Sequence, residues 1–119
     1  MFGWFKRPAR LEPEAKWLIS IQQDIIRVAD ETGSPAALPA GELSAVAIET
    51  NDTGPWGADL WWMLFDADDK LACAFPQGAT GEEAVVSYLS SLPGFDHEAM
   101  MRAMRSTGNA VFPLWRRPG

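Results

Sequence analysis

The sequence contains a single cysteine and a single histidine in 119 residues. Disulfide frameworks need paired cysteines and cysteine-based zinc clusters need several, so one cysteine excludes both, and one histidine leaves little for zinc. Histidine is also the commonest acid–base catalyst, and one copy leaves little for such chemistry. We therefore expect no metal, no cofactor and no enzymatic activity.

Long uncharged apolar runs are also missing. A membrane-spanning helix needs about 20 consecutive apolar residues, and no stretch approaches that length. The aromatic and basic opening at residues 1–8 has no long apolar core or small-residue cleavage site, as a secretory signal would. We expect no transmembrane segment and a cytoplasmic protein.

Acidic residues are absent from both ends of the chain. Residues 1–10 carry a charge of +3 and residues 102–119 carry +4, whereas residues 11–101 hold all 16 acids and three cations, which gives −13. This distribution matches the net charge of −6. An acidic body repels a phosphate backbone, which argues against broad nucleic-acid binding. The basic ends can meet a localised anion or pair with the acidic body, and we favour the pairing.

The composition is that of one folded domain. Apolar residues make up 47% of the chain and charged residues 22%, which excludes intrinsic disorder. A chain of 119 residues suits a single domain, because two would each fall below the usual size. We expect one domain over residues 1–119, of which residues 1–12 form a flexible basic and aromatic segment.

The N-terminal part has apolar residues at three- and four-residue steps, which predicts an amphipathic helix over 13–31. Pro13 suits a first helical position, and Gly33 followed by Pro35 suits a helix end. The residues on the apolar stripe are Trp17, Leu18, Ile21, Ile25 and Val28. The Pro-containing stretch 34–41 reads as a linker within the domain.

Three strands are predicted next, joined as an antiparallel meander. In 43–50, Val46 and Ile48 share one face and Ala45 and Ala47 the other. The stretch 59–66 is apolar on both faces, and 71–75 follows after a polar turn as its hairpin partner. Two apolar faces require cover on both sides, or cover of one side by a partner subunit, so a homodimer would also satisfy this pattern.

Two helices and a strand complete the prediction. Thr80 and Glu83 have the spacing of a capping box, which predicts a helix to about residue 91. Asp96 is the predicted cap of a second helix, and 110–115 is an edge strand because Pro113 has no N–H to donate. The expected fold class is α+β: N-terminal helix, three-stranded antiparallel meander, two helices and C-terminal edge strand.

Two segments are candidate binding sites. The polar stretch Asn51–Asp59 joins two apolar strands, and its candidate binding residues are Asp52, Trp56 and Asp59, because loops on rigid strands often carry binding groups. Alternatively, Trp56 folds back over the core. The second candidate is Trp115 with Arg116 and Arg117, since both residue types are enriched in binding surfaces, although a plain basic tail also explains it.

The lone reactive side chains have structural explanations. Cys73 lies among apolar residues with no basic neighbour, so we expect a buried, unreactive thiol. His97 directly follows the Asp96 cap, where the positive end of the helix dipole disfavours its charged form. We expect a surface histidine there.

Several short motifs occur in a familiar order. They are Glu49…Asp52…Gly54-Pro55, Asp59-Leu60-Trp61-Trp62-Met63-Leu64, Pro76-Gln77-Gly78-Ala79…Gly81, Leu92-Pro93-Gly94-Phe95-Asp96, Ala103-Met104-Arg105-Ser106 and Phe112…Trp115. Over about residues 45–116 the chain thereby resembles a family of small, uncharacterised bacterial proteins. The resemblance implies that the loop at 51–59 and the corner at 92–96 are family features, and it implies no reaction or ligand.

The sequence favours a non-enzymatic protein-interaction module, chaperone-like or of the immunity type, whose partner is another protein. One alternative is a small enzyme or small-molecule binder that uses the Asn51–Asp59 loop. Another is contact of the N-terminal residues 2–7 with an anionic membrane surface.

Overall fold

The computed structural model describes residues 17–30, 35–54, 57–106 and 108–118. Within 52–59 the description covers the backbone at 52–54 and 57–59 alone. The predicted N-terminal segment 1–12, including the aromatic and basic residues of the membrane alternative, lies outside these ranges.

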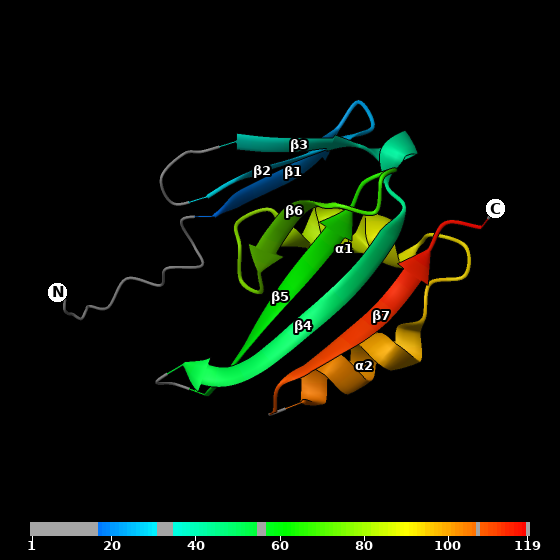
Figure 1. Ribbon diagram of the computed structural model, residues 1–119. Coiled ribbons are helices and arrows are strands. Elements are labelled where there is room, and N and C mark those ends of the chain that lie inside the picture. The colour runs from blue at the N-terminus through cyan, green and yellow to red at the C-terminus, as the bar shows by residue number, and fades with distance from the viewer. Residues whose placement is uncertain (1–16, 31–34, 55–56, 107, 119) are drawn as a thin grey trace, which may run out of the picture.

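The described chain is mostly β, with two antiparallel sheets and two helices (Figure 1). The first sheet has the order β1-β2-β3, with β1 at Leu18–Gln22, β2 at Ile25–Ala29 and β3 at Pro35–Pro39. The second has the order β6-β5-β4-β7. Its strands are β4 Ala45–Gly54, β5 Gly57–Phe65, β6 Leu71–Pro76 and β7 Ala110–Arg116, and the helices are α1 Glu82–Ser90 and α2 His97–Arg105.

The predicted α+β class with an N-terminal helix is wrong. Residues 18–29 form the hairpin β1–β2, in which Leu18 pairs with Ala29 and Gln22 with Ile25. Both turn residues, Gln23 and Asp24, have positive φ angles of 54° and 61°, as a type I′ hairpin turn requires. A β-branched run with alternate residues buried therefore overrides the helical spacing.

The predicted linker over 34–41 is also wrong. Residues 35–39 are the strand β3, which pairs with β2 along its whole length, and a 3₁₀ turn follows at Ala40–Glu42. Leu38 is buried there, and the two prolines stand at the strand ends, where a missing N–H is tolerated.

The meander β4-β5-β6 is present as predicted, and β7 pairs with β4 at the edge of the sheet. Side chains on one face of this sheet point into the core, and we call it the inner face. Its members occupy matching positions across the strands and include Val46, Ile48, Thr50, Leu60, Trp62, Leu64, Cys73, Phe75, Phe112 and Trp115.

Both helices lie behind this sheet in Figure 1, on its inner face. Val85 and Leu89 of α1 and Ala99 and Ala103 of α2 belong to the same buried cluster as the inner-face side chains. The first sheet adds further buried residues to that cluster, namely Ile19, Ile26, Val28 and Leu38. One core thus forms between the inner face, the helices and the first sheet.

The two helix starts differ. Asp96 caps α2 as predicted, accepting a hydrogen bond from the Ala99 N–H at 2.9 Å. The predicted capping box at Thr80 and Glu83 is wrong: α1 is capped by Gly81 in the left-handed region, with no side-chain bond. The backbone of Thr80 bonds to Trp17 and Ile19 instead, which attaches the first sheet to the start of α1.

Candidate protein-binding face

The opposite face of the four-stranded sheet, which we call the outer face, is built from three cross-strand rows. Each row takes one residue from each of β7, β4, β5 and β6. The rows are Arg116, Ala45, Phe65 and Leu71; Pro113, Ala47, Met63 and Ala74; and Val111, Glu49, Trp61 and Pro76. Ten of these twelve side chains are apolar, which is unusual for a sheet face without cover.

No helix in the described part of the chain covers this face. Figure 1 shows it turned toward the viewer, with α1 and α2 on the far side of the sheet. Leu71 and Val111, on the two edge strands, are 53% and 58% exposed. The β5 side chains Trp61, Met63 and Phe65 are half-buried by their neighbours.

The outer face has a ridge beside a groove. Large side chains stand along β5, whereas the neighbouring β4 positions carry Ala45 and Ala47, both 8% exposed. The relief follows from the alternation of the strands, because every second residue points to the same face.

One corner of the outer face is fixed by the first sheet. The ring of Trp17 packs edge-on against Trp61, with ring centroids 5.4 Å apart and planes at 83°. Such edge-to-face pairs are favoured by the aromatic quadrupole. Trp17 directly precedes β1, so the chain enters the described structure at this corner.

The charged residues of the outer face stand in its two end rows. Glu49 is exposed in the third row, and Arg116 in the first row forms an ion pair of 3.3 Å with Asp69. Asp69 belongs to the β5–β6 turn, where Asp66 accepts hydrogen bonds from the N–H groups of Asp68 and Lys70. The middle row contains no charge, so the centre of the face is apolar.

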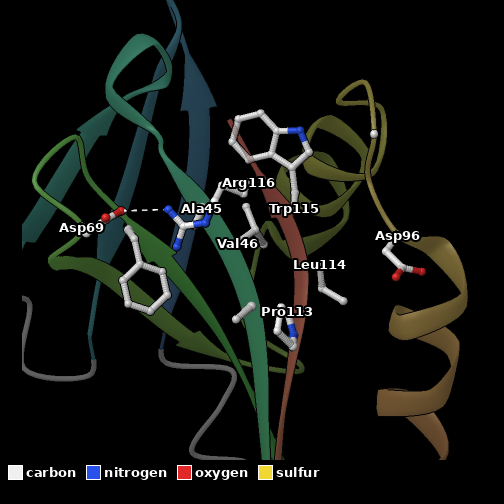
Figure 2. A pocket seen from close by; sticks show the side chains of 11 residues that line it. Ala45, Val46, Asp69, Asp96, Pro113, Leu114, Trp115 and Arg116 are labelled. Carbon is white, nitrogen blue, oxygen red and sulfur yellow. Dashed lines mark hydrogen bonds and ion pairs between the residues drawn. The ribbon is translucent and has the colours of Figure 1, made fainter. Parts of the chain in front are cut away.

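A hollow of about 520 Å³ lies at the first-row end of the outer face (Figure 2). Ala45, Phe65 and Arg116 line it on the sheet, and it reaches past β7 to Gly94 and Asp96 between the helices. The hollow therefore continues the outer face around the edge strand.

The candidate residues at the C-terminus secure the last strand. Trp115 is 8% exposed, and its indole N–H donates to the Pro93 carbonyl at 2.8 Å. Arg117 donates to the carbonyls of Leu43 and Ala40 at 2.8 and 3.0 Å, and its guanidinium lies 5.6 Å from the Trp115 ring centre. Arg116 is the member of this group that lies on the outer face.

The second candidate group lies largely outside the described side chains. Trp56 is not described, and of Asp52 and Asp59 only the backbone is. That backbone corrects the predicted long loop: β4 runs to Gly54, β5 starts at Gly57, and Asn51 pairs with Asp59. The strands thus extend well beyond the predicted ends.

The two lone reactive side chains are engaged in structural roles. Cys73 is 3% exposed on the inner face, and burial raises the pKa of its thiol, as expected from its apolar neighbours. His97 is exposed, as predicted. Its imidazole Nε2–H donates a hydrogen bond to the Ser90 carbonyl at 2.8 Å. The ring also packs against Phe95 at 4.9 Å.

Sequence reasoning noted that a partner subunit could cover one apolar face of 59–66, but it did not assemble the outer face as a binding site. Its signals were the alternation at Ala45 and Ala47 and the apolar residues on both sides of β5, such as Met63 and Phe65. What a single sequence lacks is the strand order, which decides that these positions form one continuous surface.

Within the described residues, no group of three or more His, Cys, Asp or Glu side chains is placed to hold a metal ion. No helix among them has the length and hydropathy to cross a membrane. Comparison of the chain with protein families, characterised proteins and solved structures finds no match.

Proposed function

We propose that this chain is a non-enzymatic protein-interaction module and that the outer face is its binding surface. The single observation that carries this proposal is the twelve-residue face in which ten side chains are apolar and no described helix provides cover. Contiguous apolar patches on proteins mark interaction sites, because removing them from water is favourable.

The composition of the face supports a polypeptide partner. Its centre carries Met63 between Ala47 and Ala74, with Trp61 and Phe65 beside it, and the charged side chains stand in the end rows. An apolar centre with a polar rim is the usual anatomy of a protein interface. Methionine and aromatic residues are also enriched there.

The environments of Cys73 and His97, the lone cysteine and histidine, support the non-enzymatic part of the proposal. The raised pKa of the Cys73 thiol disfavours the nucleophilic thiolate, and the residue is buried. The His97 ring nitrogen that bonds to Ser90 is already committed to a backbone carbonyl. A chaperone-like or immunity-type role requires only the binding surface.

The test is affinity capture with mass spectrometry from the native source, with Met63→Glu compared against wild type. Met63→Glu places a charge at the centre of the face, so partners that bind there are lost. Met101→Glu is the matched control, because Met101 is 49% exposed on α2, on the other side of the sheet. Unchanged capture by a folded Met63→Glu variant would refute the proposal.

A further inference from the structure

We infer that a second copy of this chain occupies the outer face, so that two sheets pack face to face as a symmetric dimer. This inference rests on the proposed function, because it names the partner of the same surface. It starts from the relief of the face: a ridge on β5 adjoins a groove on β4, and both lie at the centre of the strand order β6-β5-β4-β7.

A surface with an adjoining ridge and groove can be complementary to itself. A twofold axis that runs along the strands, between β4 and β5, places β5 of each copy over β4 of the other. In the first two rows, Phe65 then meets Ala45 of the second copy and Met63 meets Ala47, large against small; in the third row Trp61 meets Glu49. Facing positions that alternate in size interdigitate well, and a twofold interface uses the same patch on both copies.

The same axis places the outer strands over one another, β6 on β7. Leu71 then lies over Arg116 of the second copy, and Pro76 lies over Val111. Leu71 and Val111 are 53% and 58% exposed, so covering them removes apolar surface from water. Arg116, the charged residue in this end-row contact, is ion-paired with Asp69 at 3.3 Å.

The width of the face favours a sheet over a single helix as occupant. Strands lie about 4.8 Å apart, so four of them span about 19 Å, whereas one helix is only about 10–12 Å wide. A second sheet with the same twist covers all four strands, as in β-sandwiches.

The area of the face limits the strength of the dimer. Four strands and three rows cover about 400 Å² per copy, or about 800 Å² for two copies, if the face is measured flat. Stable specific interfaces bury about 1,200–2,000 Å², and smaller ones are transient. We therefore expect a dimer that dissociates on dilution.

The first experiment tests the orientation by cross-linking. Leu71→Cys and Arg116→Cys chains are mixed and treated with a short bismaleimide; native Cys73 is buried and does not compete. In the proposed dimer, residue 71 of one copy lies about 10 Å from residue 116 of the other. Two copies of the same residue are laterally about 14 Å apart, because three strand spacings separate them.

The mixed sample should therefore yield cross-linked dimers, and either variant alone should yield far fewer. Equal cross-linking of all three samples, or none in the mixture at concentrations where the chain sediments as a dimer, would overturn the proposed orientation.

The second experiment tests the dimer by sedimentation equilibrium over a wide range of concentration. We expect reversible association of the wild type, weakened at least about tenfold by Ala47→Arg, which fills the groove. Leu71→Lys should also weaken association, and because Leu71 is exposed this substitution does not threaten folding. Met101→Arg, at an exposed position on α2, is the control. Association that Ala47→Arg and Leu71→Lys leave unchanged would overturn the inference.

A wild-type chain that stays monomeric would also overturn the inference. If deletion of residues 1–12 then produced a dimer, the chain's own N-terminal segment would be the occupant. If the monomer lost captured partners through Met63→Glu, the proposed function would stand and only the dimer would fall. If Met63→Glu changed neither capture nor self-association, both proposals would fail.

Discussion

Thr50 is the single polar side chain that is buried among the described residues, at 2% exposed. Its hydroxyl donates to the Gly108 carbonyl at 2.8 Å and lies 3.2 Å from the Ser106 hydroxyl. These bonds connect β4 to the segment that leads from α2 into β7. A buried polar group in a core is tolerated because its hydrogen bonds are satisfied.

Thr50→Val keeps the shape of the side chain and removes the hydroxyl. The Gly108 carbonyl then loses its 2.8 Å donor and keeps the longer 3.5 Å bond from the Ser106 hydroxyl, so we expect a loss of about 1 kcal/mol in the free energy of unfolding, measured in urea. Thr50→Ser is the matched control, because it retains the donor and removes only a methyl group. Equal losses in both variants would show that packing, and not the hydrogen bond, stabilises this site.

The buried thiol of Cys73 leads to a prediction about how the stability of the fold depends on pH. Its thiol pKa is raised in the folded protein by burial, so the unfolded chain releases the proton at lower pH than the folded chain. Above the unfolded pKa, stability should therefore fall as the pH rises, until the folded thiol also ionises. We expect a smaller decline in Cys73→Ala between about pH 8 and 10, measured by urea unfolding at each pH. Identical pH profiles would contradict a buried, protonated thiol.

At the scale of elements, Gly81 controls how the first sheet meets α1. Gly81 has a φ of +91°, and a Cβ atom at this position would collide with the backbone carbonyl of Ile19 in β1. Only glycine fits here, for two reasons: it adopts the left-handed conformation without strain, and it has no Cβ to collide with the neighbouring strand.

Gly94 offers a matched comparison, because it has a similar φ of +86° but no atom within 4 Å of a built Cβ. Alanine at either position suffers the strain of positive φ, about 1–2 kcal/mol. Gly81→Ala should lower the free energy of unfolding by about 1 kcal/mol or more beyond this, because its Cβ would also collide with the Ile19 carbonyl. Thermal unfolding of the two variants measures the difference, and equal shifts would mean that β1 moves away freely.

The hairpin β1–β2 explains why the fold class could not be predicted. Ile21, Ile25 and Val28 satisfy a helical spacing, yet the buried residues Ile19, Ile26 and Val28 are those of two alternating strands. The turn signal was weak, because Gln23-Asp24 lacks the glycine that usually marks such turns. Periodicity over so short a stretch supports both readings, and tertiary pairing decides between them.

The elements around the candidate face were more predictable. The polar turn at Asp66 and the alternation in 43–50 indicated the meander, and Pro113 indicated the edge. The position of the helices was not predictable, since the strands of the meander are apolar on both faces. Which face becomes the core depends on the long-range packing of Val85, Leu89 and Ala103, and pattern alone does not encode it.

At the scale of the whole molecule, charge separates the two kinds of partner that the outer face could bind. Each chain carries a net charge of −6, so two copies repel one another. Binding of a basic partner would instead be attractive. The exposed ion pair between Arg116 and Asp69 contributes little to either case, as surface pairs do.

Salt therefore changes the two kinds of association in opposite directions. Between about 0.01 and 1 M ionic strength the screening length falls from roughly 30 to 3 Å. We expect self-association to become several-fold stronger over this range, because repulsion is screened while the apolar contact between Met63 and Ala47 remains. Sedimentation equilibrium at each salt concentration measures the effect, with Ala47→Arg as the non-associating reference. Self-association that weakens with salt would mean that charged groups, such as Arg116 and Glu49, hold the two copies together, and the apolar ridge and groove would not be the source of the affinity.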